Sequence, residues 1–354
     1  MIRPARPRRR GTPRRRVALA AAGLTAAALL SACSGAGPRP ALPPQRGVVQ
    51  AVPVPAYPLP SVQRLVRAAA AVQQVPPRVQ AALSGAVSDE PYGLLARRGC
   101  LPVYSTTSVS PRACVFGDPT GRHTMVVLGD SHAAMWLPAL DAIGRRTGWR
   151  VIDFNKVSCP PAEVPVYLNQ QSRPYRECGT WLRWVLPEVN SLAPDIFMIT
   201  GETGYRVLGG GSLESGLVRT LDAVTHPGTR KVVLGDIAYL AQDAPDCLEA
   251  HPADAQACST PLYQAVNQAG VRAERAAAEA AGATFIDPVP WLCSSVCTAM
   301  VGNMVVYADE QDLTQTYVRF VSGALQAALQ PAMQAVSAPG GAPTSGERPG
   351  RSTS

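Results

Sequence analysis

Short apolar runs alternate with helix-like segments through the middle of this 354-residue chain. The apolar runs lie at residues 124–129, 150–154, 195–200, 230–235 and 283–287. They are continuously apolar, which is typical of parallel strands in a sheet covered on both faces. Helices are expected at residues 133–147, 177–191, 212–225, 262–281 and 313–329. This alternation predicts a three-layer α/β/α fold with a doubly wound, mainly parallel sheet.

The N-terminus has the composition of an export signal. Residues 1–32 hold eight arginines and no acidic residue, and they include an apolar run from Val17 to Leu30. A run of about 14 residues is too short to span a bilayer comfortably, because about 20 are needed. The eight arginines account for the whole formal charge of +8, so the rest of the chain is near neutral. A nucleic-acid partner is therefore not expected.

A cysteine follows the apolar run at a position that resembles a bacterial lipobox. The residues are Leu30-Ser31-Ala32-Cys33. We expect cleavage before Cys33 and lipidation of its thiol, which makes the cell membrane a predicted partner and places the protein outside the cytoplasm. The Arg15-Arg16 pair also allows twin-arginine export, so the route stays open between that pathway and the general secretory one.

Composition divides the chain into five segments. A proline-rich tether follows the signal, and a helical lead-in interrupted by Pro76-Pro77 precedes the main domain. The C-terminal tail is rich in Gly, Pro, Ser and Thr, which predicts disorder. The segments are signal 1–32, tether 33–60, lead-in 61–94, main domain 95–332 and tail 333–354.

Eight cysteines remain when Cys33 is set aside, and an even number in an exported chain predicts disulfides. Sequence alone allows many pairings, but the cysteines fall as four close neighbours along the chain. Local pairing would give Cys100–Cys114, Cys159–Cys178, Cys247–Cys258 and Cys293–Cys297. A metal site is not predicted, because the Cys293/Cys297 pair has no second cysteine or histidine pair near it. No cofactor is indicated.

The strand at 124–129 runs directly into Gly129-Asp130-Ser131-His132 and then a helix. A serine at such a turn lies at the carboxyl edge of the sheet, where ligands bind. Backbone N–H groups at the start of the helix could stabilise an oxyanion beside it. The alternative is that Ser131 only caps the helix.

The chain resembles the SGNH-hydrolase-like domains associated with bacterial membrane acyltransferases. Gly129-Asp130-Ser131-His132 matches the first block of that family. Further matches are Val157-Ser158-Cys159-Pro160-Pro161, Arg176-Glu177-Cys178, Leu234-Gly235-Asp236 and Asp309-Glu310-Gln311-Asp312-Leu313-Thr314. The resemblance covers about residues 95–330. It implies a flavodoxin-like fold and acyltransferase or esterase chemistry, with Ser131 as the nucleophile.

One residue departs from the family pattern. The late motif of the family is Asp-x-x-His followed by Leu-Thr, and here Asp309 matches the aspartate while Asp312 stands in the place of the histidine. A carboxylate is ordinarily a weaker base than imidazole near pH 7. Repulsion between the two carboxylates would raise the pKa of one of them and make it a better base. The departure predicts impaired activity or a non-catalytic relative.

Another histidine could replace the missing one. His123 and His226 precede strands and lie at the opposite edge, and the side chain of His132 is expected to point away from the site. His251 follows the fourth strand and is the candidate substitute base. The N–H groups of Ser131, Ser158 and Gly201 are candidates for the oxyanion site.

Two functions remain open. The first is O-acyl transfer or ester hydrolysis on cell-envelope glycans, carried by Ser131, Asp309 and a base at Asp312, His251 or water. The second is a non-catalytic lipoprotein that binds an envelope glycan or a membrane acyltransferase. In the first case, the acyl donor must come from another protein or a soluble ester.

Overall fold

A computed structural model describes residues 57–110 and 114–337 of the chain. The predicted signal, Cys33, most of the tether and the tail beyond residue 337 lie outside the described residues. All described residues belong to one compact unit.

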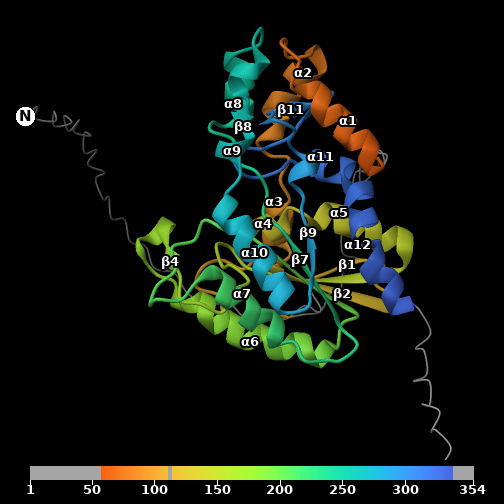
Figure 1. Ribbon diagram of the computed structural model, residues 1–354, viewed down its shortest axis with the longest axis vertical. Helices are drawn as coiled ribbons and strands as arrows, with labels where there is room; N and C mark the ends of the chain where they lie inside the picture. Colours follow the sequence, from red (N-terminus) through yellow and green to blue (C-terminus); the bar gives the residue numbers. More distant parts are fainter. Residues whose placement is uncertain (1–56, 111–113, 338–354) are drawn as a thin grey trace, which may run out of the picture. The chain divides into compact units, whose positions relative to one another are not determined.

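The centre of the molecule is a six-stranded sheet, seen in Figure 1. The strand order is β1-β3-β2-β6-β7-β9, and all pairs are parallel except β1 with β3. Five strands are those expected from the apolar runs: β2 (His123–Gly129), β3 (Trp149–Asn155), β6 (Ile196–Thr200), β7 (Arg230–Leu234) and β9 (Thr284–Ile286). The antiparallel edge strand β1 (Val115–Gly117) was not expected, because three residues carry no periodic pattern.

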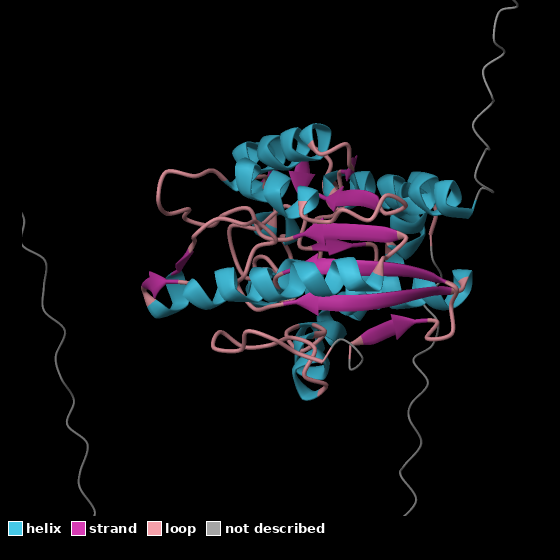
Figure 2. Ribbon diagram, turned by 90° about the horizontal axis from the view of Figure 1, so that it is seen from below, coloured by secondary structure: helices cyan, strands magenta, loops and turns pink. Residues whose placement is uncertain are grey.

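Helices cover both faces of the sheet, as Figure 2 shows. Helices α5, α11 and α12 pack on one face, and α6, α7 and α10 pack on the other. The bounds are α4 Ser131–Ala134, α5 Leu137–Thr147, α6 Arg176–Leu192, α7 Leu213–Asp222, α8 Ala244–Ala250, α9 Leu262–Ala265, α10 Gln268–Ala280, α11 Gln315–Phe320 and α12 Ser322–Ser337. The predicted three-layer, mainly parallel α/β fold is confirmed.

Three of the expected helices divide at residues that start a new helix. Pro138, in the first turn of α5, separates it from α4. The Asn267 side chain accepts from the Gly270 N–H and so begins α10 apart from α9. The Thr314 side chain accepts from the Tyr317 N–H and begins α11, and the expected helix 313–329 divides at Val321, before α12.

Three helices precede the sheet: α1 (Leu59–Ala69), α2 (Pro77–Ala86) and α3 (Tyr92–Arg97). The Pro76-Pro77 pair separates α1 from α2, with Pro77 in the first turn of α2. Val62, Val66 and Val79 are almost fully buried in the same core that lies under α5 and α12. The lead-in helices are therefore packed into the body of the described chain.

Four disulfides join the neighbouring cysteines as expected: Cys100–Cys114, Cys159–Cys178, Cys247–Cys258 and Cys293–Cys297. Three small antiparallel pairs lie outside the main sheet: β4 (Tyr167–Leu168) with β5 (Arg173–Pro174), β8 (Thr260–Pro261) with β10 (Val296–Cys297), and β11 (Met300–Val301) with β12 (Met304–Val305). The Cys159–Cys178 bond ties the loop after β3 to the first turn of α6.

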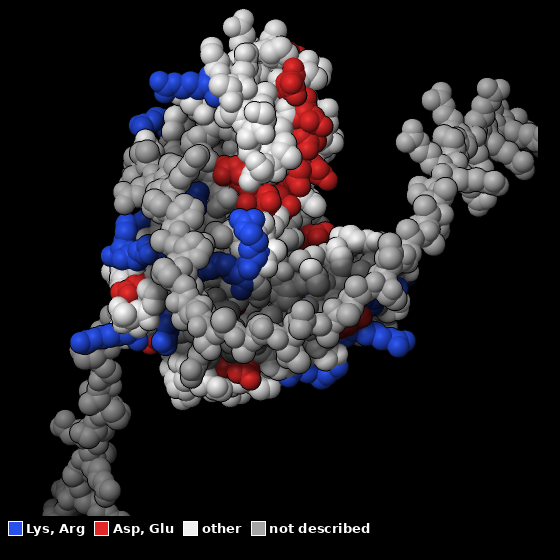
Figure 3. All heavy atoms as spheres, turned by 180° about the vertical axis from the view of Figure 1, so that it is seen from behind, with Lys and Arg blue, Asp and Glu red and all other residues white. Residues whose placement is uncertain are grey.

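Charged side chains are unevenly spread on the face drawn in Figure 3. Acidic side chains gather in the upper part of this view, whereas most basic side chains lie around its middle and lower part. Both signs of charge are therefore present on this face.

Candidate active site

Ser131 stands at the turn from β2 to α4, at the carboxyl edge of the sheet. A Cβ atom at Gly129 would lie 1.9 Å from the Thr200 carbonyl oxygen, so the close approach of β2 to β6 requires glycine at this position. Ser131 is partly exposed, whereas its neighbours Asp130 and His132 are buried. The serine is thus the accessible residue of this turn.

Asp130 fixes the shape of the turn. Its Oδ1 accepts the His132 N–H at 2.9 Å, and its Oδ2 accepts the Glu202 N–H at 3.0 Å and the Tyr205 hydroxyl at 2.9 Å. Burial, partly offset by the charge of His132, raises the pKa of Asp130 to about 7. The carboxyl group therefore links the start of α4 to the loop after β6.

His132 lies inside the site, so the expectation that its side chain points away was wrong. Its Nδ1 is 2.8 Å from Asp236 Oδ1, and its Nε2 is 4.0 Å from Asp312 Oδ1. Burial alone would lower the pKa of His132, but the carboxylates around it, led by Asp236, raise it to about 10. The carboxylates around His132 therefore favour the protonated form of its imidazole, which is a cation and not a base.

A tyrosine hydroxyl lies between Asp312 and the serine turn. The Tyr92 hydroxyl lies 2.5 Å from Asp312 Oδ1 and 3.1 Å from the Ser131 carbonyl oxygen. Burial raises the pKa of Asp312 to about 6, against the opposing effects of the His132 charge and the Tyr92 hydrogen bond. The residue in place of the family histidine thus has a pKa close to that of an ordinary imidazole.

Asp309 hydrogen bonds to the backbone of its own turn. Its Oδ1 accepts the N–H groups of Gln311 at 2.8 Å and Asp312 at 2.7 Å. Residues 309–312 form a turn, and α11 begins at Gln315, two residues after the predicted start at 313. Asp309 therefore holds the backbone that carries Asp312.

The oxyanion candidates come from three separate loops. Ser131 begins α4, and Gly201 follows β6 directly. A Cβ atom at Gly201 would lie 2.9 Å from Pro161 and 3.1 Å from Asp130 Oδ2, so Gly201 packs against the serine turn. Ser158 lies in the loop after β3 and has φ of 52°, a left-handed conformation that is uncommon for serine.

The structure does not bring His251 to the serine turn. Ala244, at the start of α8, donates its N–H to the Asp309 carbonyl, but His251 caps the opposite end of this helix. Seven residues of helix place it roughly 10 Å farther along. The loop after it is hydrogen bonded to the α1–α2 connection, through Pro252 and Val75. His123 lies at the first residue of β2 and His226 in the loop before β7, as expected.

Sequence reasoning missed Tyr92 and the pairing of His132 with Asp236. Asp236 was noticed only as part of a family motif. In the structure its carboxylate accepts from His132, from the Thr203 N–H and hydroxyl, and from the Tyr239 hydroxyl. These donors fix the position of the Asp236 carboxylate beside the His132 imidazole. No local pattern in the sequence marks Tyr92.

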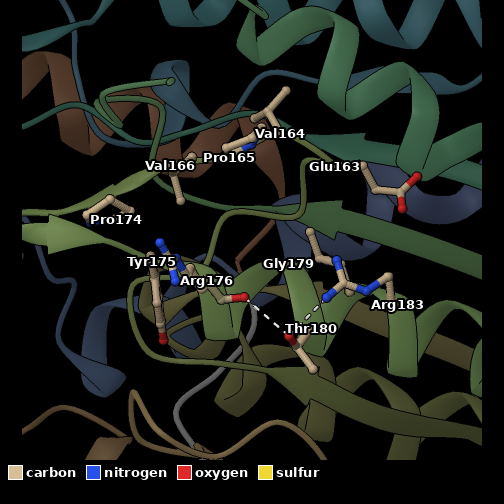
Figure 4. A pocket seen from close by; sticks show the side chains of 11 residues that line it. Glu163, Val164, Pro165, Val166, Pro174, Tyr175, Arg176, Gly179, Thr180 and Arg183 are labelled. Carbon is tan, nitrogen blue, oxygen red and sulfur yellow. Dashed lines mark hydrogen bonds between the residues drawn. The ribbon is translucent and has the colours of Figure 1, made fainter. Parts of the chain in front are cut away.

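A groove of about 640 Å³ lies on the outer side of the loop after β3, and Figure 4 shows its lining. Val164, Val166 and Pro174 form apolar walls, and Arg176 and Arg183 of α6 lie on the other side. Arg183 donates a hydrogen bond to the Thr180 hydroxyl at 3.0 Å. The loop that borders the groove starts next to the serine turn, because the Lys156 N–H donates to the Gly129 carbonyl oxygen.

The described part of the chain has neither a metal-binding cluster nor a membrane-spanning helix. Residues 57–110 and 114–337 contain no cluster of three or more His, Cys, Asp or Glu side chains arranged to hold a metal ion. Among these same residues, no helix has the length and apolar character needed to cross a membrane.

Comparison with known proteins identifies the class to which this fold and site belong. The family model described as "SGNH domain (fused to AT3 domains)" matches residues 98–327, which is more than half of the chain. The chain belongs to this family.

Two solved structures resemble it. The periplasmic domain of a lipopolysaccharide acetyltransferase from Salmonella ser. Paratyphi A is 17% identical, with a TM-score of 0.51 over 72% of this chain and 99% of that one. A carbohydrate acetylesterase family member from Sinorhizobium meliloti is 13% identical, with a TM-score of 0.34 over 60% of this chain and 98% of that one. The first structure supports the fold. The TM-score of the second is too low to support it. No curated protein matches the chain.

Proposed function

We propose that this domain transfers or hydrolyses O-acyl groups, with Ser131 as the nucleophile and the Asp312 carboxylate as the proton acceptor. The observation that carries this proposal is the placement of Asp312, which lies close to the serine turn with the Tyr92 hydroxyl between them and has a pKa raised to about 6. A general base works best when its pKa lies near the operating pH. Asp312 meets that condition better than an ordinary aspartate, whose pKa is about 3.9.

The reaction proceeds in two balanced steps. The Ser131 oxygen attacks the ester carbonyl while its proton passes to Asp312, and the proton then leaves with the donor alcohol as the C–O bond breaks. The acyl-serine is next attacked by a sugar hydroxyl or by water, which loses its proton to Asp312. The serine is released when it regains that proton, and the product is a new ester or a free acid.

The test is turnover of p-nitrophenyl acetate by the full chain, compared with Ser131→Ala. We expect slow hydrolysis by the wild type, because a carboxylate cannot relay a proton between two nitrogen atoms as imidazole does. Ser131→Ala should reduce it to the background rate. Equal turnover by the two proteins would disprove the nucleophile assignment, and no turnover by either would favour the non-catalytic envelope-binding function.

We further propose that the groove beside α6 receives a saccharide acceptor. Its volume of about 640 Å³ lies in the usual range of ligand sites, which is about 300–1,000 Å³. Apolar walls suit the faces of sugar rings, and the guanidinium groups of Arg176 and Arg183 are donors suited to hydroxyl or acidic groups. Acetylated envelope glycans have sugar rings to pack on the apolar walls and hydroxyl groups to accept from the two arginines.

Gly179→Leu tests this assignment, because Gly179 lines the groove and a Cβ atom there meets only Arg183 at 3.5 Å. We expect acetyl transfer to chitotetraose to fall about tenfold, because the leucine side chain fills space that the acceptor needs, with p-nitrophenyl acetate turnover unchanged. Gly85→Leu is the matched control, since it also replaces a helical glycine, in α2, with open space around it. Equal losses in both variants would place the acceptor elsewhere.

We propose that the protein acts outside the cytoplasm and is held to the membrane by lipid on Cys33. The lipobox-like residues support the anchor, and four disulfides are typical of an oxidising compartment. Mass spectrometry of the mature chain should find a diacylglyceryl-modified Cys33 at its N-terminus. Cys33→Ala should move the protein from the membrane fraction to the soluble one. A mature wild-type protein with a free Cys33 thiol would contradict the anchor.

A further inference from the structure

A segment upstream of the matched family region reaches into the site. The family match begins at residue 98, whereas Tyr92 lies at the start of α3. Two neighbours fix the segment to the start of α11. The Asp89 carbonyl oxygen accepts the Gln315 N–H at 2.6 Å, and its carboxylate accepts the Thr316 N–H at 3.1 Å. The Glu90 carbonyl oxygen accepts from the Gln315 side chain at 3.0 Å.

The Tyr92 hydroxyl has one proton and two acceptors within reach, the Asp312 carboxylate and the Ser131 carbonyl oxygen. A carboxylate is the stronger acceptor, and it is also the nearer of the two, at 2.5 Å against 3.1 Å. The hydroxyl therefore donates to Asp312. With its proton on Asp312, the hydroxyl does not donate to the Ser131 carbonyl oxygen, which remains a neighbour at 3.1 Å.

Four ionisable groups besides Tyr92 and Asp312 decide the charge at this place. His132 on α4 favours the ionised form of Asp312, and so does the Tyr92 hydrogen bond. Asp309 in the same turn and Glu90 before α3 oppose it, as does burial. Asp130 acts on Tyr92 itself, since it is among the carboxylates that raise the pKa of the phenol. Tyr92 thus stays neutral and serves as a donor.

We infer that Tyr92 is a positioning residue of the active site, which holds the Asp312 carboxylate beside the serine turn and in its ionised form. Helix α3 and the preceding residues Asp89 and Glu90 are thereby part of the site. The catalytic consequence rests on the proposed function, but the effect on Asp312 does not, because the ionisation of this carboxyl group can be measured without any substrate.

The decisive variant is Tyr92→Phe in the full chain, labelled with ¹³C at the aspartate carboxyl groups and titrated by NMR. Loss of the donor removes a charge-assisted hydrogen bond from the ionised form, so the Asp312 pKa should rise by about one unit or more. In the wild type, the ¹³Cζ signal of Tyr92 should follow the same titration. This wild-type signal tests the contact between Tyr92 and Asp312 even if the variant does not fold.

The matched control is Tyr317→Phe, which removes a buried hydroxyl that donates to the Trp291 carbonyl oxygen at 2.7 Å. It should cost stability and leave the Asp312 titration in place. An unchanged Asp312 pKa in folded Tyr92→Phe, or a Tyr92 signal that ignores the Asp312 titration, would overturn the inference. If the protein turns over esters, the acid limb of kcat/KM should move upward by the same amount. A shifted titration without Ser131-dependent turnover would refute only the proposed chemistry.

Discussion

Asp312→His is expected to raise kcat/KM for p-nitrophenyl acetate by about 10²-fold or more, the usual value of a positioned base. The new imidazole would occupy the place of a carboxylate that lies beside the serine turn. The protonated His132, whose Nε2 lies 4.0 Å from the present carboxylate, would favour the neutral form of a second imidazole. The neutral form is the one that accepts a proton from Ser131.

The gain must depend on the nucleophile. Asp312→His combined with Ser131→Ala should lose it completely, because the new base would have nothing to activate. His251→Ala should leave wild-type turnover unchanged, since His251 lies at the far end of α8. Loss of wild-type turnover in both Ser131→Ala and His251→Ala would show instead that the base had moved to His251.

His132→Gln is expected to destabilise the fold by about 3–5 kcal/mol, the typical cost of leaving a buried charge without its partner. Glutamine can donate a hydrogen bond to Asp236 but cannot neutralise it, and Asp312 would lose the same cation. His123→Gln is the matched control, because it removes an exposed pair. The His123 side chain is 35% exposed, and its Nδ1 lies 3.4 Å from Asp195 Oδ1. A surface pair of that kind is worth about 0–1 kcal/mol.

The same network gives a pH dependence of definite sign. The pKa of His132 is raised in the folded state to about 10, so its stabilisation is complete below about pH 6.5 and is lost as the pH rises towards 10. Asp130 and Asp312 also have raised pKa values, so they favour the folded state more at lower pH. These three groups together should make the free energy of unfolding fall with rising pH.

Urea unfolding at pH 6 and pH 9 tests this sign. Wild type should lose a few kcal/mol between the two values, as expected for a histidine whose pKa is raised by more than one unit. His132→Gln should lose clearly less, whereas His123→Gln should behave as the wild type does. Equal losses in wild type and His132→Gln would show that His132 is not a buried cation.

The fold could be predicted because its signals are local. Buried parallel strands are apolar throughout, so five of them are visible as runs such as 124–129, and the disulfides join cysteines that are close in sequence. The site was only partly predictable. Ser131 and Asp312 are in motifs, but Tyr92 and Asp312 are 220 residues apart, and nothing near Tyr92 marks that contact. The direction of His132 was misjudged because α4 has only four residues, too few for a helical face to be assigned.

The docking of residues 89–92 onto the start of α11 also bears on how such domains are exchanged between genes. A recombination that joined a new N-terminal partner at residue 98, where the family match begins, would deliver every strand of the sheet and the serine turn. It would leave behind the helices that bury Val62 and Val79 and the hydroxyl that faces Asp312. A fusion that keeps the site and this part of the core intact therefore has to begin no later than α1.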